Sequence, residues 1–170
     1  MKKINWKMLI ITTIVSLLPI GIGLVFYDKL PNDVAIHFDI NNNPDNYFPK
    51  LAFVFGMPIM MALLQVFCCV VNDISDKNEE ANQKMVTVSK WIIPIISIIL
   101  YVVTVSFALG NNIDIRKIVM LILGVMFIVM GNYLPKTKGN NYLKVRIQDE
   151  KLENRVKRIF GYIFIFTIFY

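Results

Sequence analysis

The residues best suited to chemistry lie between positions 30 and 50, where Asp and Asn alternate at positions 39, 41, 43 and 45. This alternation resembles the opening of a calcium-binding loop, but Pro44 stands where such a loop needs glycine and Lys50 where it needs glutamate. His37 is the only histidine of the chain, so it cannot build a zinc site with others. No serine or cysteine stands in this segment as a nucleophile. We therefore predict no metal, no cofactor and no enzymatic activity.

The remaining polar groups are sparse and lie inside apolar sequence. Cys68 and Cys69 are adjacent, and neighbours on a helix point about 100° apart, so we expect small apolar fillers and no disulfide between them. Gln65 is the only amide in the first three apolar runs and marks a polar contact between helices. We find no ionisable group inside these runs, and an ion pump or proton-coupled transporter usually needs one.

The elements that position these residues are apolar runs of membrane-spanning length. The chain has 170 residues, of which 56% are apolar and 18% charged. Four uncharged runs each suffice for a helix that crosses about 30 Å of hydrocarbon. A fifth run stops after twelve residues, so the chain looks truncated or ends in a half-buried helix. We predict an all-α, multipass transmembrane bundle of four full spans and a short or truncated fifth, with one structured outer loop at 27–50. The runs are Met8–Phe26, Leu51–Val71, Trp91–Leu109, Ile118–Leu134 and Ile159–Tyr170.

The distribution of positive charge predicts the orientation. With the N-terminus in the cytoplasm, the inner segments 1–7, 72–90 and 135–158 hold three, three and eight Lys and Arg residues, against two in each outer loop. This bias follows the positive-inside rule. We therefore assign the net charge of +6 to contact with anionic lipid, so that the lipid bilayer is the expected partner of these residues. We expect no direct contact with nucleic acid.

The inner segments also carry helix signals. Asp76 and Glu79 have the spacing of a capping box, and apolar residues follow at helical spacing from Ala81 to Ile92. We predict a short helix at the inner membrane surface before the third span. Glu153 and Lys157 support another helix from about Gln148 into the fifth run.

Two motifs resemble a known family. The outer-loop stretch from Leu30-Pro31 to His37-Phe38, followed by Pro44-Asp45 and Tyr47, is similar to the N-terminal domain of unknown function that heads SdpI-like bacterial membrane proteins. A second stretch at the end of the fourth run looks like the motif of the SdpI-like immunity family at its inner face. It consists of Gly131, Asn132, Tyr133, Leu134, Pro135 and Lys136.

The resemblance implies two parts and a function. Residues 1–71 form an N-terminal two-span unit, and 72–170 form an SdpI-like span unit that is C-terminally incomplete, since the later spans of the family are missing or cut. The sequence also departs from the family at Lys144, where a glycine is expected. Members of the family occur in the cell membrane of Gram-positive bacteria and confer bacteriocin immunity against a secreted toxic peptide. Some are thought to hold a cytosolic repressor protein at the membrane. The alternatives are an envelope-stress sensor and a transporter accessory subunit, both without catalysis.

The outer loop is the expected recognition segment for the toxic peptide. Its candidate residues are Pro31, His37, Phe38, Asp45 and Tyr47. Aromatic anchors among acidic side chains suit a cationic or amphipathic peptide. The same residues also fit a lid that only ties the first two spans together, and His37 fits a polar turn that packs on the ends of the spans.

Overall fold

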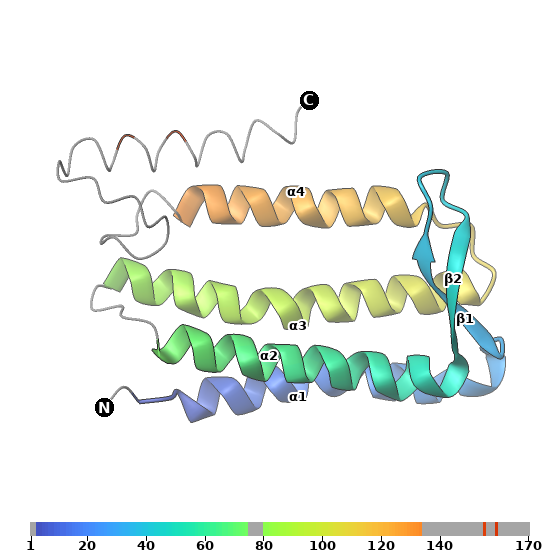
Figure 1. Ribbon diagram of the computed structural model, residues 1–170, viewed down its shortest axis with the longest axis horizontal. Coiled ribbons are helices and arrows are strands. Elements are labelled where there is room, and N and C mark those ends of the chain that lie inside the picture. Colours follow the sequence, from blue (N-terminus) through green and yellow to red (C-terminus); the bar gives the residue numbers. More distant parts are fainter. Residues whose placement is uncertain (1–2, 75–79, 134–154, 156–158, 160–170) are drawn as a thin grey trace. The chain divides into compact units, whose positions relative to one another are not determined.

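The computed structural model describes residues 3–74 and 80–133, together with Arg155 and Ile159. Along the chain the elements are mostly helical, with one small sheet (Figure 1). They divide into two compact units, the first comprising residues 1–74 and 90–120 and the second 75–89 and 121–170. The elements are α1 (Trp6–Val25), the 3-10 helix η1 (Tyr27–Lys29), β1 (Asp33–Phe38), β2 (Pro44–Pro49), the π-helix η2 (Ala52–Gly56), α2 (Met57–Ile74), α3 (Glu80–Ala108) and α4 (Ile115–Tyr133).

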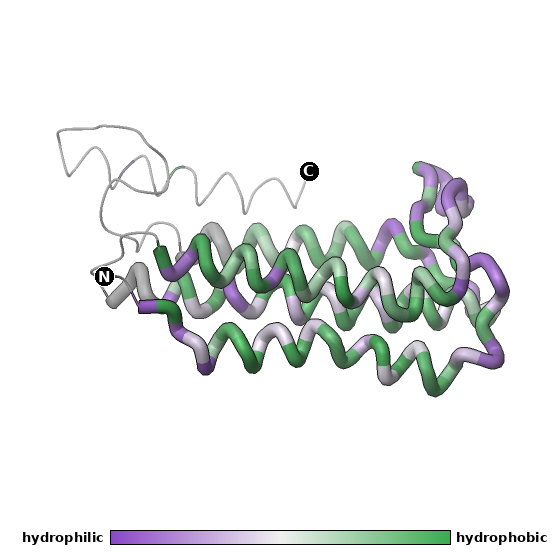
Figure 2. The backbone as a smooth tube through the Cα atoms, turned by 60° about the horizontal axis from the view of Figure 1, so that its bottom comes forward, coloured by the Kyte–Doolittle hydropathy of each residue, from purple (hydrophilic) through white to green (hydrophobic). Residues whose placement is uncertain are grey.

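Three helical segments are long and apolar enough to cross a membrane, namely Trp6–Val25, Ala52–Ile74 and Lys84–Ala108. At about 1.5 Å per residue, the 20 residues of the first reach about 30 Å. Figure 2 shows the helices coloured mainly as hydrophobic, while the most hydrophilic stretches lie in and around the hairpin. Many large apolar side chains on these helices are exposed, as expected for surfaces that contact lipid.

α1 and α2 pack side by side, and the hairpin of β1 and β2 connects them (Figure 1). The Asn5 side chain caps α1 by accepting a hydrogen bond from the Met8 N–H at 3.1 Å. The π-helix η2 precedes Pro58, and the Met57 N–H bonds to the Ala52 carbonyl five residues back. Because Pro58 has no N–H for the Val54 carbonyl, the normal helical ladder is interrupted here.

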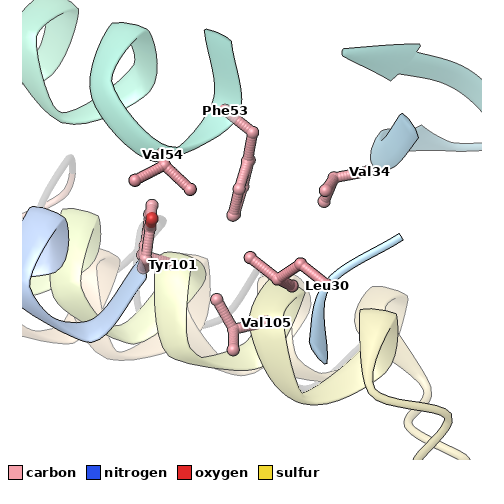
Figure 3. Packing of buried hydrophobic residues seen from close by; sticks show 6 residues of the cluster. All are labelled: Leu30, Val34, Phe53, Val54, Tyr101 and Val105. Atoms are coloured by element: carbon pink, nitrogen blue, oxygen red, sulfur yellow. The ribbon is translucent and has the colours of Figure 1, made fainter. Parts of the chain in front are cut away.

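A small hydrophobic core lies where the hairpin, η2 and α3 meet (Figure 3). The Phe53 and Tyr101 rings stack with their centroids 4.7 Å apart and their planes 9° apart. Gly23 of α1 lies against the Tyr101 hydroxyl, since a Cβ at that glycine would be only 2.2 Å from it. Close packing of this kind, more than the hydrophobic effect, holds helices together within lipid. The cluster consists of Leu30, Val34, Phe53, Val54, Tyr101 and Val105.

The structure agrees with the predicted helices in the first unit and differs in two details. The predicted short surface helix is not separate, because α3 runs without a break from Glu80 to Ala108. The outer loop, predicted without strands, contains a two-stranded antiparallel sheet. α4 matches the fourth apolar run but is not among the three candidate spans. The predicted fifth run and the helix from Gln148 lie outside the described residues, apart from Arg155 and Ile159.

Candidate functional site

The hairpin lies between α1 and α2, and its two strands pair in a bulged register. Val34 pairs with Phe48 and Ala35 with Tyr47, and Ile36 falls in an irregularity before His37 pairs with Asn46. The sequence suits a strand because β1 contains the β-branched residues Val34 and Ile36 and ends at the aromatic Phe38. Val34 and Ala35 are buried, whereas β2 is exposed along most of its length.

The turn of the hairpin is closed by Asp39, the residue that began the calcium-like spacing. Its Oδ1 accepts hydrogen bonds from the backbone N–H groups of Asn41 at 2.8 Å and Asn43 at 2.7 Å, and its Oδ2 accepts one from Asn43 Nδ2 at 3.2 Å. The bond from the Asn43 backbone is the main reason that the pKa of Asp39 lies below its usual value. The alternating Asp and Asn residues therefore build a turn, and the described residues contain no cluster of three or more potential metal ligands of the His, Cys, Asp and Glu types.

Asn42, in the same turn, joins the hairpin to the beginning of α4. It adopts a positive φ of 65°, which asparagine tolerates better than most residues. Its Nδ2 donates to the Ile113 carbonyl at 3.1 Å, and its Oδ1 accepts from the Ile115 N–H at 2.9 Å. Asn42 thus caps a helix that begins 73 residues later. The Arg116 guanidinium adds a hydrogen bond to the Ile40 carbonyl.

Asp114 precedes α4 and supports the same junction. Its carboxylate bonds to Arg116 at 3.3 Å and to the backbone N–H of Lys117 at 3.3 Å. Partial desolvation alone would raise the pKa of Asp114, but the bonds from Arg116 and Lys117, with the charges of both residues, outweigh it and lower the pKa.

The base of the hairpin is also fixed. The Lys50 N–H donates to the Asn32 carbonyl at 2.7 Å, and its ammonium group donates to the Leu30 carbonyl at 3.3 Å. The same ammonium lies 4.8 Å from the centre of the Tyr27 ring, a cation–π distance. Lys50, which rules out a calcium loop, therefore holds the two ends of the hairpin together. With both ends tied, the hairpin presents β2 in one orientation.

The predicted recognition residues separate into packed and exposed groups. Phe38 is partly buried and meets Phe107 of α3 edge to face, with centroids 4.9 Å apart. His37 Nδ1 and Asp45 Oδ1 form an exposed hydrogen bond of 2.5 Å. Tyr47, 49% exposed, and Pro31 face solvent. Phe38 thus packs the hairpin against α3, and the exposed Tyr47 ring is available to contact a ligand.

Phe48, which the prediction names with Phe38 and Tyr47 as an aromatic anchor, and Ile40, which it does not name, extend the exposed apolar surface. Ile40, in the turn, is 84% exposed, and Phe48 of β2 is 37% exposed. Single exposed apolar side chains are normal on a protein surface, so Ile40 is informative only together with Tyr47 and Phe48.

The free edge of β2 is protected against pairing with another strand. Pro44 and Pro49 have no N–H group, and the Tyr47 N–H is bonded to the Asn46 side chain at 2.8 Å. Prolines and occupied donors are the usual means of blocking an edge strand. A ligand of this hairpin would therefore be recognised through side chains and not by strand addition.

A second polar centre lies inside the first unit at Gln65, and it confirms the predicted polar contact between helices at this amide. The Gln65 amide nitrogen is within hydrogen-bonding distance of Thr12 Oγ1 at 2.8 Å, the Lys90 carbonyl at 2.8 Å and Cys69 Sγ at 3.1 Å. The Lys90 carbonyl is available because Pro94, four residues later in α3, has no N–H to occupy it. The spacing of Lys90 and Pro94 was the signal that could have located this contact.

Lys90 itself departs from the predicted arrangement. It was assigned to an inner loop, yet it lies within the candidate span Lys84–Ala108 and its side chain is buried. Its ammonium group pairs with Asp73 at 2.5 Å. The candidate span Lys84–Ala108 therefore contains a buried ionisable group, one position before the uncharged run Trp91–Leu109.

The predicted inner-face motif is only partly described. Gly131, Asn132 and Tyr133 belong to α4, which ends at Tyr133. Leu134, Pro135 and Lys136 lie outside the described residues. The proposed role of this corner thus remains a prediction.

Together, the described residues form a mostly helical chain with three helical segments long and apolar enough to cross a membrane, and the hairpin connects the first two of them. A family model described as a domain of unknown function (DUF1648) matches residues 14–62. The match covers the second half of α1, the entire hairpin, η2 and the beginning of α2. No curated protein and no solved structure matches the chain.

Proposed function

We propose that this chain is an SdpI-like membrane protein that protects a Gram-positive bacterium from a secreted toxic peptide by binding the peptide at the hairpin. The observation that carries the proposal is the fixed hairpin between two span-length helices, with Ile40, Tyr47 and Phe48 exposed. Rigid aromatic and aliphatic side chains are effective anchors because little conformational entropy is lost on binding. The DUF1648 match covers this same hairpin.

Within this proposal the N-terminus is cytoplasmic, α4 is the fourth span and the hairpin faces the outside of the cell membrane. A membrane-active peptide reaches that surface first. Protection then requires capture and no catalysis. The two exposed groups His37 and Asp45, already bonded to each other, offer polar contacts beside Tyr47.

The test is survival of a sensitive bacterium that expresses the chain. Cells are challenged with the low-mass fraction of spent medium from the strain that carries the gene, and membrane levels are measured through a C-terminal tag. We expect the wild-type chain to protect and Tyr47→Ala to protect less at equal membrane level. The matched control is Phe67→Ala, which also truncates an aromatic residue exposed on α2, outside the hairpin. It should protect like the wild type.

Two results would contradict the proposal. If the wild-type chain gives no protection, the immunity function is wrong. If it protects and both Tyr47→Ala and Ile40→Ala protect equally well, the peptide is not bound at the hairpin. Phe38→Ala separates support from recognition, because losing its contact with Phe107 should lower the membrane level itself.

A sensor of envelope stress is the second candidate, favoured by one observation. The turn that would meet a ligand also caps α4 through Asn42, so binding at the hairpin has a direct route to that helix. A reporter fused to the C-terminus distinguishes the two functions, since a sensor changes its output on challenge even where it gives no protection.

A further inference from the structure

A buried ion pair joins three helices at the end of the first unit opposite the hairpin. Asp73, near the end of α2, holds the Lys90 ammonium of α3 at 2.5 Å, and their side chains are only 10% and 3% exposed. The second oxygen of the same carboxylate accepts the backbone N–H of Asn5, the cap of α1, at 3.0 Å. One carboxylate therefore connects the beginning of α1, the end of α2 and the body of α3.

The Lys90 side chain reaches this carboxylate from deeper in the bundle. Its carbonyl is bonded to Gln65, and Gln65 precedes Asp73 by eight residues, which is about 12 Å along a helix. The aliphatic stem of Lys90 therefore runs from the level of the Gln65 contact toward the end of α2. It lies between the polar contact and the solvent beyond the ion pair.

The polar contact behind the ion pair is incompletely satisfied. We name Thr12, Gln65 and Cys69 the polar cluster; all three are fully buried. Gln65 Oε1 has no hydrogen-bond partner among the described residues. An unpaired amide oxygen is costly away from water. Water that entered here would satisfy it, while the separated ions would regain their own hydration.

We propose that the Asp73–Lys90 pair is a latch that closes the polar cluster to water, and that the protein has a second state in which the latch is open. The closed state gains the ion pair and leaves Gln65 Oε1 without a protein partner among the described residues. The open state loses the ion pair, and water hydrates the Asp73 carboxylate, the Lys90 ammonium group and the Gln65 oxygen. Opposing contributions of this kind keep two states close in free energy, so that contacts at the ends of α1–α3 shift their populations. The proposal does not depend on the function assigned to the hairpin.

Cys69 is a native reporter of the open state. It is fully buried in the polar cluster, and only the thiolate, which needs water, reacts with a maleimide. The experiment measures the rate of alkylation by N-ethylmaleimide of the full chain in detergent micelles, with Cys68→Ala present throughout. Lys90→Met retains most of the stem and removes the charge. Lys84→Met is the control, because Lys84 is an exposed residue of the same helix.

We expect Lys90→Met and Asp73→Asn to raise the alkylation rate of Cys69 by about tenfold or more, because the rate follows the population of the open form and breaking a buried pair is strongly unfavourable. Lys84→Met should leave the rate unchanged. The exchanged pair Asp73→Lys with Lys90→Asp should recover a large part of the slow rate. A slow rate in both single variants would overturn the proposal.

A second reporter separates local opening from general unfolding. Ala35→Cys, in a background without the native cysteines, places a thiol at a buried hairpin position. Opening of the latch should raise the alkylation rate of Cys69 and leave the thiol at position 35 protected. If Lys90→Met accelerates both positions equally, the pair only stabilises the fold and the latch is wrong.

Discussion

Gly23 is predicted to be the position in α1 least tolerant of a single added methyl group. In Gly23→Ala the new Cβ would lie 2.2 Å from the Tyr101 hydroxyl and 3.0 and 3.2 Å from the two Val54 methyl groups. Reaching an ordinary contact of 3.4 Å from the hydroxyl requires a displacement of about 1.2 Å, the difference of the two distances. Tyr101 cannot swing away easily, because its ring is buried and stacked on Phe53.

The expected cost is about 1–3 kcal/mol, typical of overpacking in a well-packed interior. Gly21→Ala is the matched control, since nothing lies within 4 Å of a Cβ at that position. Both variants gain the helical preference of alanine, about 1 kcal/mol or less. The difference between the two free energies of unfolding therefore isolates the strain at Gly23.

The assay is reversible unfolding in mixed micelles by increasing fractions of sodium dodecyl sulfate, followed by circular dichroism. Tyr101→Phe removes the atom in closest conflict, and that hydroxyl has no hydrogen-bond partner among the described residues, so its removal should cost little. The double variant Gly23→Ala with Tyr101→Phe should recover about 0.5–2 kcal/mol relative to additivity, as expected for residues in direct contact. Equal stabilities of Gly23→Ala and Gly21→Ala, or no recovery in the double variant, would refute the close approach of α1 and α3.

Three further predictions concern the hairpin and the orientation. Asn42→Ala removes the acceptor for the Ile115 N–H, so hydrogen exchange of the Ile115 amide should accelerate by a factor that corresponds to about 0.5–2 kcal/mol. In Asn42→Asp, which keeps an acceptor oxygen, the same amide should exchange nearly as slowly as in the wild type. The pKa of Asp39 is lowered in the folded hairpin, so the stabilisation by this carboxylate is complete above the usual value of 3.8 and is lost as the pH falls through the lower folded value. Nuclear magnetic resonance of the turn amides should show this transition. Asp39→Asn should abolish the transition. In intact cells without the native cysteines, an impermeant maleimide should label Asp33→Cys and not Asn82→Cys, and the opposite pattern would reverse the predicted orientation.

The helices of the first unit could be predicted closely because their signal is length and apolar composition alone. The first run, Met8–Phe26, differs from α1 by two residues at one end and one at the other. The helix predicted over Ala81 to Ile92 is present, but as the beginning of α3 and not as a separate short helix. A lysine such as Lys90 can remain in a long helix when its stem reaches a carboxylate. The sheet in the outer loop was missed because irregular pairing at Ile36 breaks the alternation that identifies strands.

The candidate site shows the same division. The sequence located the hairpin and excluded a calcium loop at Pro44 and Lys50. It could not show that Phe38 is a support and Tyr47 an exposed group, because this depends on Phe107, 69 positions away from Phe38. The pairing of Asp73 with Lys90 also could not be predicted from the sequence. Both residues flank apolar runs, and a single charge in such a position only indicates the end of a span.

The cap that Asn42 provides for α4 also sets an order of events during synthesis. The acceptor oxygen is made 73 residues before the Ile115 N–H that it receives. At about 5–20 residues per second the ribosome needs about 4–15 s to add that stretch. During this interval the Asn42 side chain has no α4 to cap, so α1, the hairpin and α2 are synthesised before this contact can form. Chains stalled before Ile115 should therefore carry a hairpin whose turn is open to proteases, and release of the stall should make it resistant.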